Sequence, residues 1–463
     1  MKLQRALQIC CFIVLGGISP LYSFAGEEPV LSSQPNVILI IADDLGIQLG
    51  CYGDPQALTP NIDQLASTGT RFETAWVTAA SCSPSRGSIH TGRYPHQTGL
   101  VGLAHHGFSM DDHYPTIASE LKARGYRTGV IGKYHIAPHD LCPWDYQLTQ
   151  EVNRDLVANN RDVVAMSEIA EGFVAGNSGP FFLVMSYIDP HVPLFDQRLG
   201  LPEDPVSSEQ TEVFPFSGYS SAALKQRTAS YLNCINRLDT GIGLFMDMLE
   251  DNEVMDNTLI IFIGDHGPPF PRAKMSSYDL GLRIPFIVSG PNLQSEALSQ
   301  QPVSTVDILP TILDYVGAPV IDDLPGQSLL GILEGEAVAD VERPLFSSYT
   351  AHQADATFPM RVMRLEDLVF IENLSSNAVR PRPETDGAPL WPGDSGYPLE
   401  GVDTDTVYQT YRQPPRYELY NLATDPNCFE NLAYRGDFKD RVADLNSQLQ
   451  LWRKQTNDPT LKP

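Results

Sequence analysis

One short stretch places a cysteine, a proline and an arginine in a fixed frame: Cys82, Pro84 and Arg86 within the run SCSPSRGSIHTGR. The residues after the cysteine are compatible with a helix, with Ser81 or Ser83 as its cap and Pro84 in its first turn. The start of a helix offers free N–H groups and a positive dipole end, which stabilise an anion. We therefore expect Cys82 to lie where an oxyanion would be held. A loop cysteine beside a surface arginine is the simpler alternative.

Two continuous apolar runs end in groups that can bind a cation. The runs are NVILIIADD at residues 36–44 and NTLIIFIGDHG at residues 257–267. Each is typical of a buried parallel strand, and in open α/β sheets the ligand lies beyond the carboxyl ends of the strands. The terminal groups are Asp43, Asp44, Asp265 and His266. Oxygen-rich ligation favours a hard divalent cation, calcium over magnesium or zinc.

Two further runs end in cationic or proton-handling groups. They are RTGVIGKYH at residues 127–135 and PFFLVMSYIDPH at residues 180–191. Lys133 and His135 are two positions apart, so we expect them to share one face of a strand. The full set is Arg86, Lys133, His135, His191 and Lys274. Such groups at the ends of buried strands are better explained by a tetrahedral anion than by solvent exposure.

The elements that must position these groups alternate between strand and helix as far as residue 345. The expected strands are 36–44, 72–77, 127–135, 180–191, 257–267 and 284–290, and the expected helices are 59–67, 116–124, 155–173, 220–249 and 305–316, with one more after Cys82. This alternation predicts an α/β domain over residues 26–345, with a large, mostly parallel sheet flanked by helices. Residues 346–463 are expected to form a smaller α+β domain with an antiparallel sheet. Its expected elements are strands at 345–349, 361–363 and 368–371, a loop at 380–405, turns at 417–433 that serve packing, and a closing helix at 437–453.

Composition limits the partners. The chain has 463 residues, 42% of them hydrophobic, and a formal net charge of −26. This charge disfavours nucleic acid and would not steer an anionic substrate, so an anion site must be locally basic or built on a metal ion.

Residues 1–25 resemble a secretory signal peptide, with a charged start, a short apolar core and a small-x-small cleavage site. No later stretch is long and apolar enough for a membrane anchor. We therefore expect a secreted or periplasmic protein. The single N-glycosylation sequon, at 373–375, makes a lysosomal protein less favoured than a bacterial one.

The cysteine count also points to Cys82. Seven cysteines less the two in the signal segment leave an odd number, which in a secreted chain indicates a free thiol. The pairing of the other four stays open: Cys51, Cys142, Cys234 and Cys428. No Cys/His spacing of a zinc site is present.

Across nearly the whole mature chain these motifs resemble the type I sulfatases, whose fold is alkaline-phosphatase-like, and most closely the sulfamidase (heparan N-sulfatase) branch. The matching stretches are SCSPSR, GVIGKYH, PFFLVMSYIDPH, NTLIIFIGDHGPPFP and ELYNLATDP. In that family the cysteine of the C-x-P-S-R frame is oxidised to formylglycine, whose hydrate is the nucleophile. The resemblance implies an enzyme that releases sulfate from a sulfated saccharide and is matured by a formylglycine-generating enzyme. It leaves the oligomeric state open.

The resemblance also implies a role for each site residue. Calcium would be bound by Asp43, Asp44, Asp265 and His266, with the modified Cys82 completing the shell. Arg86 and Lys133 would hold the hydrate, while Lys274 and His191 would grip the sulfate and help the leaving group depart. His135 would take the proton that lets the sulfated hydrate expel sulfate and regenerate the aldehyde.

Two positions depart from the sulfamidase pattern: His266 stands in place of Asn, and Lys274 in place of Arg. These departures leave the chemistry in place and weaken the transfer of substrate identity. His105, His106 and His352 fall in stretches that resemble the sulfamidase pocket, so they are expected substrate contacts, with solvated loop histidines as the alternative. The expected substrate is N-sulfoglucosamine at a glycan end.

Three other functions are alternatives. An O-sulfatase would share the mechanism and differ in substrate. A phosphoesterase or phosphonate hydrolase of the same superfamily would typically use Thr, Ser or an unusual Cys as nucleophile, often with two metals, and the complete C-x-P-S-R frame argues against it. A non-catalytic secreted glycan-binding protein would have lost at least one charged site residue, and none is lost.

Overall fold

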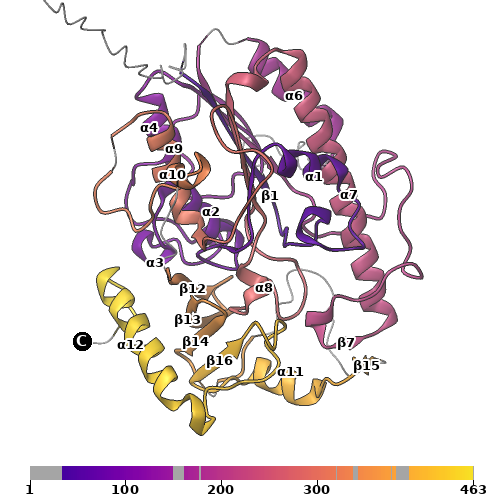
Figure 1. The fold of residues 1–463 in the computed structure, drawn as a ribbon, viewed down its shortest axis with the longest axis vertical. Helices are drawn as coiled ribbons and strands as arrows, with labels where there is room; N and C mark the ends of the chain where they lie inside the picture. Colours follow the sequence, from indigo (N-terminus) through magenta and orange to yellow (C-terminus); the bar gives the residue numbers. More distant parts are fainter. Residues whose placement is uncertain are drawn as a thin grey trace, which may run out of the picture. The chain divides into compact units, whose positions relative to one another are not determined.

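A large sheet is built from strands that lie between residues 36 and 299 (Figure 1). The computed structural model describes residues 34–149, 161–176, 179–319, 321–336, 342–376, 378–381 and 396–461. Within these ranges eight strands pair in the order β10-β2-β9-β8-β1-β6-β4-β5. Their bounds are β1 Asn36–Ala42, β2 Thr70–Phe72, β4 Arg127–Gly132, β5 Tyr146–Thr149, β6 Phe181–Tyr187, β8 Thr258–Gly264, β9 Phe286–Ser289 and β10 Ala297–Ser299. All pairings are parallel except those of β9, which runs antiparallel to both β8 and β2.

Helices flank this sheet on both faces (Figure 1). One group comprises α1 Pro60–Ser67, α6 Val163–Ala175 and α7 Ala222–Asp251, and α7 contacts both of the others. The other group comprises α2 Cys82–Thr91, α3 Pro95–Thr98, α4 Ile117–Lys122, α9 Ile308–Tyr315 and α10 Leu330–Leu333. The short α8, Asp279–Leu282, follows β8. Among the described residues, no helix combines the length and apolarity that a membrane span requires.

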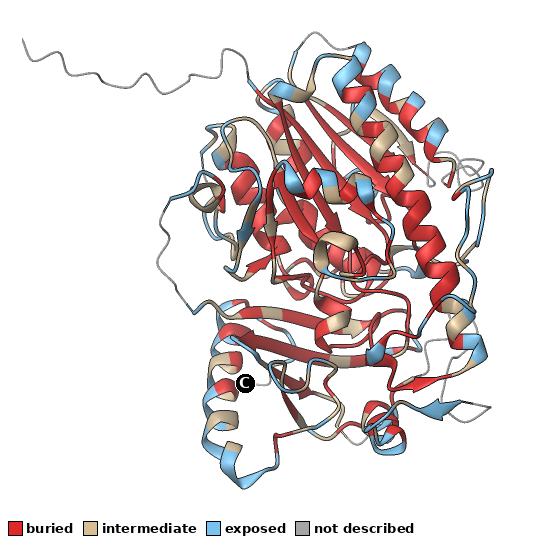
Figure 2. Ribbon diagram, turned by 45° about the vertical axis from the view of Figure 1, so that its right-hand side comes forward, coloured by how far each residue is buried: buried red, intermediate tan, exposed pale blue. Residues whose placement is uncertain are grey.

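The apolar runs of the sequence are explained by burial. All seven residues of β1, β6 and β8 are buried, because each strand is covered on both faces. Figure 2 shows buried residues along the strands, with the exposed residues on the outer sides of the helices. The expected α/β architecture is confirmed.

A second, smaller sheet follows in the sequence. It has four antiparallel strands in the order β12-β13-β14-β16: Leu345–Ala351, Thr357–Leu365, Leu368–Asn373 and Tyr417–Asn421. The helix α12, Lys439–Gln455, packs on β13 and β14, and α11 spans Thr404–Arg412. The described residues also form two short strand pairs: β3 Ala75–Trp76 with β11 Val303–Ser304, and β7 Tyr219–Ser220 with β15 Tyr397–Pro398. The expected antiparallel sheet is therefore confirmed. Residues 35–463 cluster as one compact unit, so the division at residue 345 stays a prediction.

Several expected elements differ in detail. The strand expected at 72–77 is two short strands, β2 and β3, which belong to different sheets. The strand β16 and the helix α11 were not predicted, because turn residues and a Pro/Gly-rich loop dominate the local pattern. The signal segment 1–25, residues 155–160 of an expected helix and much of the loop 380–405 lie outside the described residues.

The expectation that Lys133 and His135 share one face of a strand is wrong, because β4 ends at Gly132. Gly132 has a φ of 99°, and a Cβ there would lie 1.9 Å from the carbonyl oxygen of Ser186. The close approach to β6 therefore requires glycine, and the chain turns out of the sheet at this point. His135 itself has a φ of 57°.

Candidate active site

The carboxyl ends of four neighbouring strands and the start of one helix converge at a single site. The strands β1, β4, β6 and β8 are parallel neighbours, so the residues that follow them meet at the same edge of the sheet. The loop after β8 adds Lys274. Direct contacts connect all ten expected catalytic and metal-binding residues: Asp43, Asp44, Cys82, Arg86, Lys133, His135, His191, Asp265, His266 and Lys274.

Cys82 is the first residue of α2, and it is buried. Its Sγ lies 3.3 Å from Nε2 of His266, and in formylglycine an oxygen replaces this sulfur. Ser81 is the N-cap residue of α2, as expected, but it makes no capping hydrogen bond through its side chain. The Ser81 hydroxyl pairs instead with Nδ1 of His352 at 3.0 Å, and the Ser83 hydroxyl accepts the N–H of Ala104. The start of α2 is thus fixed from outside the helix, by residues of two other segments.

Four side chains form a group that could hold a metal ion. One ligand atom from each of Asp43, Asp44, Cys82 and His266 lies within 4.8 Å of the others, and all four residues are buried. Burial raises the pKa of Asp44, and burial together with the charge of Asp43 raises the pKa of Asp265 to about 7. A divalent cation would offset this crowding of negative groups, and carboxylate oxygens are the ligands that calcium prefers. The donor set therefore fits a calcium ion.

Asp265 lies beside this group and is held by other partners. Its Oδ2 accepts the Nε–H of Arg86 at 2.9 Å, and its Oδ1 accepts the backbone N–H of Asp44 at 2.9 Å. The same Oδ1 lies 3.8 Å from Nε2 of His266. Asp265 thus connects the metal group to Arg86.

The cationic side chains are buried against these carboxylates. Arg86 also donates to the carbonyl oxygen of Lys133 at 2.8 Å and to Oγ of Ser186 at 2.7 Å. Lys133 pairs with Asp43, and Nζ of Lys274 lies 2.9 Å from Oδ1 of Asp44. These contacts fix three positive groups around Cys82. Burial opposes ionisation of the Cys82 thiol, but the charges of Lys133 and Lys274 together hold its pKa well below the usual value.

Four further histidines lie beside Cys82 or its neighbours, two of them buried and two exposed. His135 is hydrogen-bonded to Cys82, and its Nε2 lies 2.7 Å from Nδ1 of the exposed His105. His106 is exposed beside His105, with ring centroids 4.2 Å apart. His352 is buried and reaches the site through Ser81. His105 and His352 therefore reach Cys82 through His135 and Ser81, His106 lies beside His105, and a substrate role for the three histidines stays a prediction.

His191 completes the site from the loop after β6. Its Nε2 lies 3.9 Å from Oδ2 of Asp44, its Nδ1 contacts the carbonyl oxygen of Val192, and its side chain is 24% exposed. Two arginines, Arg161 and Arg237, reach the same loop without having been predicted. Only Asp189 could have indicated these arginines from the sequence: it is an acid two positions before His191, and it is not part of the metal group.

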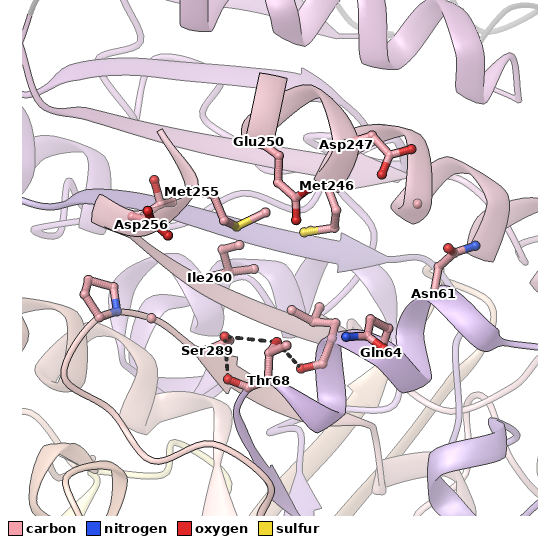
Figure 3. Close-up of a pocket in the computed structure, with 15 residues that line it drawn as sticks. Asn61, Gln64, Thr68, Met246, Asp247, Glu250, Met255, Asp256, Ile260 and Ser289 are labelled. Carbon is pink, nitrogen blue, oxygen red and sulfur yellow. Dashed lines mark hydrogen bonds between the residues drawn. The ribbon is translucent and has the colours of Figure 1, made fainter. Parts of the chain in front are cut away.

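Two other features lie outside this site. A cavity of about 370 Å³ opens between α1, α7 and the start of β8, and none of the predicted residues lines it (Figure 3).

The five described cysteines are free thiols: Cys51, Cys82, Cys142, Cys234 and Cys428.

The fold and the site define a hydrolase of the alkaline-phosphatase-like class. The sulfatase family matches residues 35–318, and the chain belongs to this family. It is thus a sulfuric ester hydrolase. In sequence it is 30% identical to the human N-sulphoglucosamine sulphohydrolase, with 92% of this chain and 91% of that protein covered. It is also 28% identical to an ulvan-active sulfatase of Formosa agariphila, with 94% and 83% covered.

Solved structures agree on the fold. A protein in complex with its substrate D-glucosamine-2-N,6-O-disulfate superposes with a TM-score of 0.70 at 18% identity, covering 93% of this chain and 100% of that one. The phosphonate monoester hydrolase of Agrobacterium radiobacter also gives a TM-score of 0.70 at 18% identity, covering 92% and 97%. At these identities the likeness concerns the fold alone.

Proposed function

We propose that this protein releases sulfate from a sulfated sugar, with formylglycine made from Cys82 as its nucleophile and N-sulfoglucosamine at a glycan end as its substrate. The observation that carries the mechanism is the position of Cys82, buried at the start of α2 and 3.3 Å from His266 in the metal group. The substrate is supported by the 30% identity to the human N-sulphoglucosamine sulphohydrolase.

The residues of the site divide the work between them. A bound calcium ion would supply positive charge for the sulfate group, and formylglycine made from Cys82 would supply, as its hydrate, a hydroxyl nucleophile. Asp43, Asp44, Asp265 and His266 would hold the ion, together with the modified Cys82.

The cations and histidines of the site would bind the anion and move protons. Arg86 and Lys133, fixed by buried carboxylates, would hold the hydrate in place. Lys274 and His191 lie on the Asp44 side and would grip the sulfate and protonate the leaving group. His135, which contacts Cys82, would accept the proton of the hydroxyl there. His105 and His106 would contact the sugar from the exposed side, and His352 would complete the pocket wall.

Maturation and location belong to the same proposal. Cys82 would be oxidised by a formylglycine-generating enzyme before the site becomes buried. The signal-like residues 1–25 would direct the protein to the periplasm or outside the cell.

The test is sulfate release by protein co-expressed with a formylglycine-generating enzyme. The panel holds N-sulfoglucosamine, 6-O-sulfated glucosamine, a sulfated galactose and an aryl phosphate, with Cys82→Ala as the control. Release from N-sulfoglucosamine alone, absent from the control, is the expected result. Release only from an O-sulfated sugar would keep the mechanism and overturn the substrate, and phosphate release that survives Cys82→Ala would overturn both.

A further inference from the structure

A buried carboxylate beside the active site is held by two arginines that contribute nothing to the metal group. Asp189 follows β6 and is 2% exposed. Arg237, from the middle of α7, donates from Nε to Oδ2 at 2.7 Å and from Nη2 to Oδ1 at 2.9 Å. Arg161, just before α6, contacts the same Oδ1 through Nη1. The carboxylate therefore accepts three charge-assisted hydrogen bonds.

The second nitrogen of Arg161 connects this cluster to the catalytic loop. Its Nη2 donates to the backbone carbonyl oxygen of His191 at 2.7 Å. Arg237 reaches the other side of the loop, where Nη1 donates to the carbonyl oxygen of Phe195 at 3.3 Å. The guanidinium of Arg161 also lies over the ring of Phe195, 5.1 Å from its centroid. We call Arg161, Asp189 and Arg237 the His191 clamp.

Burying the three charged groups of the His191 clamp has a high cost in desolvation free energy. Removing three charges from water costs several kcal/mol per ion before pairing offsets it, and apolar packing of the same volume is often as stable. A guanidinium, however, is a rigid planar fork, so it fixes direction as well as distance. The imidazole of His191 is 24% exposed, so packing alone does not fix it. Its backbone is fixed instead, by Arg161 and by its own N–H to the carbonyl oxygen of Ile188 at 2.7 Å.

We propose that Arg161 is a positioning residue for His191, acting with Asp189 and Arg237 to hold the imidazole where it meets the leaving group. This inference rests on the proposed function, because the leaving group is the sugar atom that loses its sulfate. If the His191 backbone moves, the imidazole no longer reaches that atom, and a displacement of about 1 Å can cost on the order of 10²-fold in rate.

The test uses leaving groups of different quality. A sugar amine or hydroxyl departs only with a proton, whereas 4-nitrophenolate departs without one. For Arg161→Gln we expect kcat on sulfated glucosamine to fall about 10- to 100-fold, and kcat on 4-nitrophenyl sulfate to change less than about threefold. In a His191→Ala background, Arg161→Gln should cause no further loss on either substrate, because the two changes remove the same function. Arg161→Lys keeps the charge and should recover part of the rate on the sugar.

Arg361→Gln is the matched control, since Arg361 also holds a buried aspartate, Asp458, through two hydrogen bonds, but in the small sheet. It should lower the melting temperature and affect both substrates equally per folded molecule. Equal losses on both substrates in Arg161→Gln, or additive losses with His191→Ala, would overturn the clamp. Should Arg161→Gln fail to fold, the same substrate comparison on Arg161→Lys decides the question. Wild-type protein that releases sulfate from neither substrate would contradict the proposed function instead.

Discussion

Two of the buried clusters of charged side chains in the described part of this molecule are built differently. Beside the small sheet, Asp458, which follows α12, accepts hydrogen bonds from Arg361 of β13 at 2.7 and 2.8 Å and from Arg453 of α12 at 2.8 Å. Arg453 also donates to Glu372 at 2.7 Å. Each acid there has an arginine, and although burial acts to raise the pKa of Asp458, its hydrogen bonds with Arg361 hold that pKa below the usual value.

In the active-site cluster each carboxylate also has a cationic partner, but the acids lie against one another. Asp43, Asp44 and Asp265 lie together with the Cys82 sulfur, and the pKa of Asp265 is raised to about 7 by burial and by Asp43. The comparison teaches that arginine partners keep Asp458 of the structural cluster charged, whereas the acids of the active site stay crowded against one another despite their cationic partners, so this second cluster could take up a metal ion. Substitutions in the active-site cluster should therefore affect activity more than stability. Substitutions in the cluster beside the small sheet should affect stability more than activity.

The largest effect is expected for Cys82→Ala. Loss of the nucleophile should lower sulfate release by on the order of 10⁴- to 10⁶-fold, as for nucleophiles of other hydrolases. The melting temperature should change by no more than a few degrees. Inorganic sulfate is quantified by ion chromatography and unfolding by calorimetry. If Cys82→Ala kept a tenth of the wild-type rate of sulfate release, Cys82 would not be the nucleophile.

His135→Ala should give the next largest loss. A positioned proton acceptor contributes about 10²- to 10⁴-fold, so kcat on a sulfated sugar should fall within that range with the fold intact. Steady-state kinetics with circular dichroism as the folding control measure this. An unchanged kcat would assign the proton transfer to another group.

Asp458→Asn should have the opposite signature. Removing one partner of a buried ion pair costs about 3–5 kcal/mol in the free energy of unfolding, and activity per folded molecule should stay within about twofold. Because the pKa of Asp458 is lowered in the folded state, its contribution is present above the unfolded pKa of about 3.9 and declines as the pH falls further. Urea unfolding at pH 7 and pH 3 should show the difference between wild type and variant shrinking. A difference that grows in acid would contradict the charge assignment.

Calcium should stabilise the protein through the active-site cluster alone. At 100 times its dissociation constant, a ligand of the folded state adds about 2.7 kcal/mol. Calcium added after chelation should therefore raise the melting temperature of wild type and of Asp458→Asn alike, and leave Asp43→Asn unchanged. A calcium shift that survives Asp43→Asn would place the ion elsewhere.

The sequence predicted those parts that depend on local pattern. The continuous apolar run of β1 indicated a buried parallel strand with polar residues gathered at one edge, and the strand and the gathering of those residues are both present. The frame around Cys82 placed a helix start correctly. The features that the sequence did not predict depend on contacts between segments that are far apart in the chain. The end of β4 follows from the approach of Ser186 to Gly132. The partners of Asp189 come from the middle of α7 and from the turn just before α6, 48 and 28 residues away in sequence. No periodicity or short motif records such pairs.

One measurement tests the central claim most directly: mass spectrometry of the peptide that contains Cys82, on preparations with graded co-expression of a formylglycine-generating enzyme, together with the sulfate-release rate of each. We predict that the rate rises in proportion to the fraction of Cys82 converted to the aldehyde, and extrapolates to zero when all of it remains a thiol. A rate that is independent of this fraction would contradict the proposal that Cys82 supplies the nucleophile.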